Sequence, residues 1–321
     1  MIRSRNLAPF IHTEMTAPYI YMTHIVALLP CVIAGIIFYG ITAITLIAVC
    51  ATAFMLLDNA FGRMVRRDGI DRNYADFSSI EAGVIFALML PPGTSIIIAL
   101  TGVLFGSFVV KQFFGGAGNN ILNPACVARL FVEMVFPSQM ECFKTPFTSW
   151  FDITTLIGNM DNVAARDDVS TLYLIELIAG SYTGYIGMTC AGMILIAGIY
   201  QVFKGTVRMY APLSYLVVLM IIYPIKDGSF HSVIPFILFS GALFVAVYVL
   251  GDFTTMPSRN MGGVIAGAIC AVLTVILIGR VSDMCALLAP VMAINFLSFE
   301  IDFFTKAIAH RKTTRQREVE L

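Results

Sequence analysis

Apolar runs, each close to the length of a membrane-spanning helix, recur from end to end of this chain and constrain its fold more than any other feature. A helix that crosses a bilayer needs about 20 predominantly apolar residues. Only 12% of the residues are charged, whereas a soluble domain carries about 25%. The runs end at glycine, proline or charge, and they predict ten segments: residues 20–39, 41–61, 77–90, 94–113, 121–136, 183–203, 209–225, 230–250, 261–279 and 283–304. The sequence therefore predicts an all-α polytopic membrane protein with about ten transmembrane helices.

The basic residues are distributed unevenly about these ten segments. Of the 20 Lys and Arg residues, 15 fall on one side, 4 fall on the other, and Arg129 lies within a segment. Loops rich in Lys and Arg stay in the cytoplasm. We therefore expect a multi-pass protein of the cell's inner (plasma) membrane with both termini cytoplasmic.

One long connection divides the predicted segments into two groups of five. The expected parts are a cytoplasmic N-terminal segment, a first half, an extracytoplasmic loop, a second half and a basic cytoplasmic tail: residues 1–19, 20–136, 137–182, 183–304 and 305–321. Residues 102–116 weakly resemble residues 241–252, and each of these runs leads into a polar break. Five spans per half would place the halves in opposite orientations, so an inverted repeat with broken helices is predicted.

The first polar break interrupts the fifth segment. Residues 115–137 read GGAGNNILNPACVARLFVEMVFP. Proline lacks an N–H and suits the first turn of a helix, so Asn123-Pro124 is predicted to begin one inside the membrane. Arg129 and Glu133 are one turn apart and can pair on one face. Alternatively, the helix N-terminus and Arg129 face an anionic ligand.

Two acidic residues lie in or beside other apolar segments. Asp252 occupies the corresponding break of the second half, where it either caps an interfacial loop or contributes to an internal site. Glu81 lies in the short third segment. It is predicted either to relay protons or bind a cation, or to cap the helix and pair with a nearby Arg.

Motifs of soluble enzymes are missing from the sequence. There is no P-loop, no dinucleotide-binding GxGxxG after a strand, no HExxH and no nucleophile elbow. We therefore assign no catalytic residue and no metal site. The expected surroundings are the lipid bilayer and partner proteins, with no nucleic acid.

Several ordered blocks of the sequence resemble the sequence pattern of one family of membrane proteins. Residues 4–40 are similar to the family's opening, and DFSSIEAGVIFALMLPPG (76–93) is similar to its DGSAxxTGLLLALxLPP. The most specific block is VKQFFGGAGNNILNPACVARLFVEMVFPSQM (110–140), which resembles VKxLFGGxGxNxFNPAxxGRAFLxxxFPxQM. GDFTTMPSRNMGGVIAGAICAVLTVIL (251–277) matches DxxTSPxxxxGxxxxGxxxGxLTxxI. The family that these blocks resemble is the RnfD/NqrB family, which comprises the D-type protein of the Rnf electron-transport complex and the B-type protein of the sodium-pumping NADH:quinone reductase.

The resemblance implies a membrane subunit that carries flavin and passes electrons between ferredoxin and NAD, coupled to Na⁺ or H⁺ transport. It also implies sister subunits: the flavin protein RnfG, the membrane proteins RnfA and RnfE, and the iron–sulfur proteins RnfB and RnfC. This chain has no iron–sulfur motif and no nucleotide site of its own. It is therefore not expected to catalyse a full reaction alone. The polar breaks described above make Asn123, Arg129 and Asp252 candidates for cofactor binding.

Family members hold FMN through a phosphoester to the threonine of a Ser-x-Ala-Thr motif in the extracytoplasmic loop. Here the loop reads RDDVSTLYLIEL, residues 166–177. Alignment of Asp167 and Ser170 with the motif's Asp and Ser puts Tyr173 at the threonine position. This register needs no shift, and it is the one that we favour.

The second register keeps a threonine, Thr171, but puts residues 168–170 where the motif has Ser-Gly-Ala. Thr171 is thus a candidate for covalent FMN, and Tyr173 takes its place in the first register. Riboflavin or another flavin bound without a covalent bond is the alternative in both.

Two other functions compete with a flavin-bearing subunit. Residues 123–125 read Asn-Pro-Ala, which is also the half-helix signature of water channels, so a small-solute channel or facilitator is one alternative. The second half contains no further Asn-Pro-Ala. The other alternative is a divergent, flavin-poor structural subunit of the same kind of complex.

Overall fold

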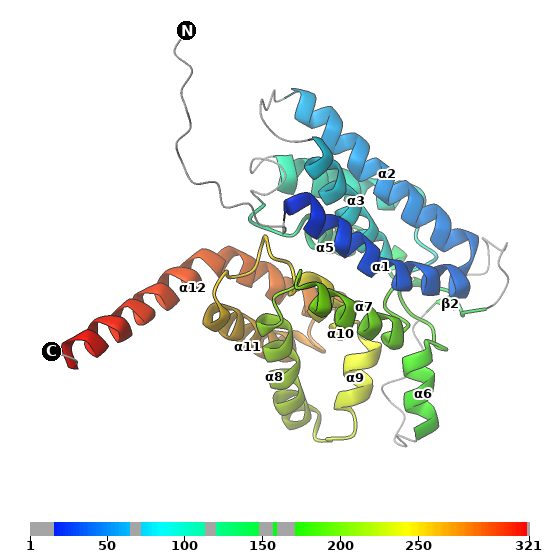
Figure 1. The fold of residues 1–321 in the computed structure, drawn as a ribbon. Coiled ribbons are helices and arrows are strands. Elements are labelled where there is room, and N and C mark those ends of the chain that lie inside the picture. The colour runs from blue at the N-terminus through cyan, green and yellow to red at the C-terminus, as the bar shows by residue number, and fades with distance from the viewer. Residues whose placement is uncertain (1–15, 65–71, 113–119, 148–156, 159–170, 320–321) are drawn as a thin grey trace, which may run out of the picture.

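The computed structural model describes residues 16–64, 72–112, 120–147, 157–158 and 171–319, and in these ranges the chain is mostly helical (Figure 1). The first group of helices is α1 (Ala17–Tyr39), α2 (Ile41–Met64), α3 (Arg72–Leu88), α4 (Ile96–Phe105), the π-helix η1 (Gly106–Gln112) and α5 (Pro124–Val135). The second group is α7 (Ala191–Lys204), α8 (Tyr210–Asp227), α9 (Val233–Phe239), α10 (Ala242–Phe244), the π-helix η4 (Val245–Val249), α11 (Asn260–Leu277) and α12 (Asp283–Val319).

The two groups of helices lie side by side as two halves (Figure 1). In the first half, α3 packs against α1 and α2, and α4 packs against α2 and α5. In the second half, α11 packs between α8 and α12. The halves meet where α1 contacts α7 and where α5 contacts α12.

The connection between the halves contains short elements. These are a 3₁₀ turn, η2 (Pro137–Gln139), a two-stranded antiparallel sheet of β1 (Cys142–Phe143) and β2 (Ile157–Gly158), and the helix α6 (Thr171–Ala179). The sequence patterns did not predict α6. Within the predicted flavin loop, residues 148–156 and 159–170, which include Asp167 and Ser170, lie outside the described residues.

Each of the ten predicted segments contains a helix, and in the part of the chain that the structure describes five helices are long and apolar enough to cross a membrane. These five are Ala17–Tyr39, Ile41–Phe61, Tyr210–Asp227, Asn260–Leu277 and Asp283–Ala309. Phe77–Leu88, Ile96–Lys111 and Ala191–Lys204 are shorter apolar helices. The all-α membrane fold is confirmed, and the number of spans stays a prediction.

Two predicted segments differ from the structure. The segment at 183–203 becomes helical only at Ala191, and the segment at 230–250 is divided into α9, α10 and η4. Its division falls at Gly241, which has a positive φ of 87°. An L-residue with a side chain rarely adopts that backbone conformation.

The non-helical backbone before α7 pairs with the chain that leaves α3. Ile186 N–H donates to Leu90 O at 3.1 Å, and Gly187 N–H donates to Leu88 O at 2.8 Å. A Cβ atom at Gly187 would come within 2.6 Å of the Leu88 Cβ, so only glycine allows this approach. Irregular backbone at membrane depth is tolerated where protein satisfies its polar groups.

The two segments with similar sequences also have similar helical geometry. In each, an α-helix changes to a π-helix directly after the matching phenylalanine, at Phe105 in the first half and at Phe244 in the second. π-helical stretches are rare in proteins, and those that occur often lie at functional sites. Each stretch leads into a polar break, and the two breaks lie next to each other, as the site below shows.

Candidate functional site

The first half contributes a capped helix end to the site. Asn123 is the N-cap of α5, and its side-chain oxygen accepts hydrogen bonds from Ala125 N–H at 3.1 Å and Cys126 N–H at 3.3 Å. Pro124 occupies the first helical position, where its missing N–H costs nothing. The predicted helix start at Asn123-Pro124 is confirmed.

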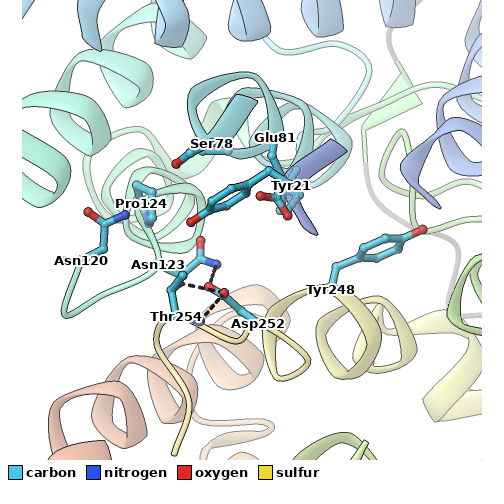
Figure 2. A pocket seen from close by; sticks show the side chains of 11 residues that line it. Tyr21, Ser78, Glu81, Asn120, Asn123, Pro124, Tyr248, Asp252 and Thr254 are labelled. Carbon is cyan, nitrogen blue, oxygen red and sulfur yellow. Dashed lines mark hydrogen bonds between the residues drawn. The ribbon is translucent and has the colours of Figure 1, made fainter. Parts of the chain in front are cut away.

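The second half contributes Asp252, which follows η4. Its carboxylate accepts hydrogen bonds from the backbone N–H and the hydroxyl of Thr254, at 2.9 and 2.8 Å, and from the Thr255 hydroxyl at 3.1 Å. The fourth donor is the Asn123 amide, at 3.3 Å (Figure 2). One hydrogen bond thus joins the breaks of the two halves, which are 129 residues apart in the sequence.

A small polar cavity of about 20 Å³ lies beside this contact (Figure 2). Its polar lining residues are Tyr21, Ser78, Glu81, Asn120, Asn123, Tyr248, Asp252 and Thr254. The side-chain oxygen of Asn120 is buried and has no hydrogen-bond partner. A site of this size and polarity admits about one water molecule or a small ion.

Glu81 lies at the cavity and pairs with a histidine. Its Oε1 atom is 2.8 Å from Nδ1 of His24, which lies on α1. The other ring nitrogen of His24, Nε2, is 3.3 Å from the carbonyl oxygen of Thr206, between α7 and α8. Glu81 therefore has a partner, as one of our two interpretations required, but the partner is His24 and not an arginine.

A second buried ion pair lies within the first half. The Lys111 Nζ atom, at the end of η1, is 2.9 Å from Asp58 on α2 and 2.7 Å from the Ser79 hydroxyl on α3. Ser79 also donates to Asp58. Lys111 was counted among the loop bases in the topology prediction, whereas its side chain is fully buried. A buried lysine is costly unless it is paired, so this contact fixes η1 against α2 and α3.

Arg129 and Glu133 form the predicted ion pair one turn apart on α5. Arg129 is fully buried, and its Nε–H donates to Met89 O at 2.9 Å. The guanidinium also lies over the ring of Tyr185, at 5.5 Å. Arg129 does not line the cavity beside Asn123. Its contacts instead hold α5 to the end of α3, and its role toward a cofactor stays a prediction.

The two candidate flavin residues lie at the start of α6. Thr171 is the first residue of this helix. The Tyr173 side chain is only 4% exposed and packs in a small cluster with Leu177, Tyr182 and Phe239. A phosphoester on the Tyr173 hydroxyl would have to draw this ring out of the cluster. The packing of Tyr173 therefore does not favour it as a point of attachment, and the choice between Tyr173 and Thr171 stays a prediction.

Sequence reasoning found Asn123, Asp252 and Glu81 but not His24 or Lys111. A histidine within an apolar span is itself a signal, because polar residues there are costly and have partners. Among the described residues, no group of three or more His, Cys, Asp or Glu side chains is arranged to hold a metal ion. The site is instead a water-sized polar cavity with a protonatable pair at one wall, and this suits the passage of a proton or a small cation.

Comparison with protein families decides which kind of protein contains this site. Residues 5–310 match the model of the NQR2, RnfD, RnfE family. The chain belongs to this family. The match covers both halves, the breaks at Asn123 and Asp252, and the connection that contains α6.

Individual relatives in the family align along nearly the whole chain. The D-type protein of the Na(+)-translocating ferredoxin:NAD(+) oxidoreductase complex of Acetobacterium woodii is 28% identical over 317 residues, with 97% of this chain and 96% of the relative covered. The D-type protein of an ion-translocating oxidoreductase complex of Salmonella arizonae is 24% identical, with 95% and 98% covered. The corresponding protein of Halorhodospira halophila is also 24% identical, with 83% of each chain covered.

Proposed function

We propose that this chain is the D-type membrane subunit of an Rnf-type ion-translocating oxidoreductase complex. In this role it passes electrons through flavin, between ferredoxin and NAD, while the complex moves Na⁺ or H⁺ across the membrane. The observation that carries the proposal is the family match over residues 5–310, together with D-type relatives that align over nearly their whole length. The polar cavity at the junction of the halves supports the ion-handling part.

The proposed organisation is ten crossings in two inverted halves of five, residues 20–136 and 183–304, with both termini in the cytoplasm. Two features support an internal repeat. First, each half changes from α-helix to π-helix at the same point of the similar segments. Second, the residues Asn123 and Asp252, which follow these π-helices, are hydrogen-bonded to each other. Breaks that meet at the centre of a membrane protein are where inverted-repeat transporters bind their ions.

The proposed flavin is FMN, attached to Thr171 in the outer connection. Burial of Tyr173 supports this choice between the two registers, because a phosphoester needs a hydroxyl that is open to a bulky group. When bound, FMN would supply one- or two-electron transfer. The chain itself would supply the anchoring hydroxyl and the helix start at α6. A flavin held without a covalent bond is the alternative.

The proposed partners are the sister subunits of such a complex: the flavin protein RnfG, the membrane proteins RnfA and RnfE, and the iron–sulfur proteins RnfB and RnfC. Exposed apolar side chains cover much of α8, α11 and α12, including Phe296, Phe299 and Phe303. Surfaces of this kind suit lipid and neighbouring membrane proteins equally.

Ion transport in membrane vesicles tests the function. Inverted vesicles are prepared from cells that lack the chain and from cells in which it has been restored. Reduced ferredoxin and NAD are added, and uptake of ²²Na⁺ and of protons is followed. We expect ferredoxin-driven ion uptake only in the restored vesicles. Equal uptake in both preparations would refute the proposed function.

A further inference from the structure

His24 and Glu81 form a buried polar pair that the proposed function does not yet use. The two residues are 4% and 8% exposed, respectively. They come from different helices, α1 and α3, and His24 also reaches the other half of the molecule through Thr206. Residues 24 and 206 are 182 positions apart in the sequence, so this contact is one of the links between the halves.

The two contacts of His24 fix how many protons the pair holds. A backbone carbonyl oxygen only accepts hydrogen bonds, so the contact with Thr206 requires a proton on Nε2. The contact with Glu81 requires a second proton between Nδ1 and Oε1. The pair is then either imidazolium with carboxylate or neutral imidazole with carboxylic acid. Both forms have the same number of protons and a net charge of zero.

We propose that His24 and Glu81 form a proton-binding site at the junction of the two halves, and that the described conformation is its proton-loaded state. The ligand of this site is the proton itself. The cavity beside Glu81 is large enough for a water molecule, which supplies a route by which the proton enters and leaves.

The charged groups around the pair determine what its protonation changes, which is the net charge next to Asp252. The charge of Asp252 interacts with both His24 and Glu81. The charge of Lys111, which is itself paired with Asp58, interacts with Glu81. Other protonatable groups nearby belong to Tyr21, Tyr248 and Cys126. Tyr248 is engaged through its hydroxyl, which donates to Ala27 O at 2.8 Å. The loaded pair is neutral next to Asp252, whereas an unloaded pair would put a second negative charge there.

Release of the proton removes one of the two hydrogen bonds of His24. One proton leaves the pair to water at the cavity, and the pair acquires a charge of −1. If the remaining proton stays between Nδ1 and Oε1, the lone pair of Nε2 faces the carbonyl oxygen of Thr206 at 3.3 Å, and the two repel. If it stays on Nε2, two acceptors face each other at 2.8 Å. In both cases a favourable contact becomes an unfavourable one.

When the hydrogen bond to Thr206 is the one lost, loading and release bias the position of α1 relative to the connection between α7 and α8. When the hydrogen bond to Glu81 is lost instead, they bias α1 relative to α3. A transporter couples an ion to movement when the ion is bound with different affinity in two arrangements. The transport part of this inference rests on the proposed function, since it makes the proton an ion that this chain handles. The protonation state of the pair does not depend on that function.

The first experiment counts protons in the full-length protein, purified with whatever subunits accompany it and reconstituted in lipid nanodiscs at pH 7. ¹⁵N-histidine NMR distinguishes imidazolium from neutral imidazole, and infrared difference spectra detect a protonated carboxyl group. We expect one of these two signatures in the wild type, and its loss in Glu81→Gln or His24→Gln. Control variants are His231→Gln and Glu300→Gln, both at exposed positions. A neutral His24 together with an ionised Glu81 in the wild type would overturn the inference.

The second experiment measures ferredoxin-driven ion uptake against pH. A single essential proton makes the rate fall by about tenfold per pH unit on the alkaline side of its transition. We expect Glu81→Gln and His24→Gln to abolish or shift this limb and both control variants to keep it. An unchanged profile in assembled, active variants refutes a role of the pair in transport. If the wild type shows no ferredoxin-driven uptake, the proposed function fails, and the proton count still tests the site.

Discussion

The contacts of Arg129 predict that its replacement lowers the stability of the protein. Replacement by Leu removes the hydrogen bond to Met89 O and leaves Glu133 without its cation. Removing one partner of a buried ion pair costs about 3–5 kcal/mol. Because Arg129 is fully buried and also lies over Tyr185, we expect Arg129→Leu to lose an amount of stability in this range. This corresponds to a decrease in Tm on the order of 5–10 °C.

Thermal unfolding of the purified protein in nanodiscs measures this loss. The double variant Arg129→Leu/Glu133→Leu removes both charges, so it should recover about 1–3 kcal/mol relative to the sum of the single variants. Arg280→Leu is the matched control, because Arg280 is exposed, and it should leave Tm unchanged. If Arg129→Leu unfolds at the wild-type temperature, the ion pair does not stabilise α5. Flavin content per folded protein, measured on the same samples, tests the predicted cofactor role of Arg129.

Three further predictions concern other parts of the chain. Asn123→Ala removes the N-cap of α5, so it should lower the free energy of unfolding by about 1 kcal/mol, measured as a lower Tm. Asn123→Ser should restore most of this stability. Equal stability of the two variants would contradict the capping role. Lys111→Met should lower the free energy of unfolding by about 3–5 kcal/mol, and the double variant Lys111→Met/Asp58→Asn should recover part of that loss. Additive losses of stability would show that the two side chains are not coupled. Thr171→Ala should remove the flavin-fluorescent band after denaturing electrophoresis, whereas Tyr173→Phe should keep it; the opposite pattern would assign attachment to Tyr173.

Much of the fold followed from the sequence because apolar run length and helix breakers act locally. All ten predicted segments contain helix, and the Asn123-Pro124 start was found from the proline and its preceding cap residue. The non-helical stretch before Ala191 was missed because its residues continue the apolar run of the helix that follows. Its backbone is satisfied by Leu88 and Leu90, about a hundred positions earlier, and no local pattern shows this.

The site was predicted only in part for the same physical reason. Asp252 and Glu81 stand out as acids in apolar surroundings, and costly residues of this kind have partners. Which partner they have depends on tertiary packing. The Glu81–His24 and Asn123–Asp252 contacts join residues 57 and 129 positions apart. The burial of Lys111 likewise depends on how η1 packs against α2 and α3.

The composition of the complex tests the central claim most directly. An affinity-tagged form of the chain is purified from its native membranes in mild detergent. The co-purifying proteins and the flavin content of the preparation are then determined. The proposed function predicts the sister flavin, membrane and iron–sulfur proteins in fixed ratios, together with ferredoxin-dependent NAD reduction. A chain that purifies alone, contains no flavin and conducts small solutes in liposomes would contradict it.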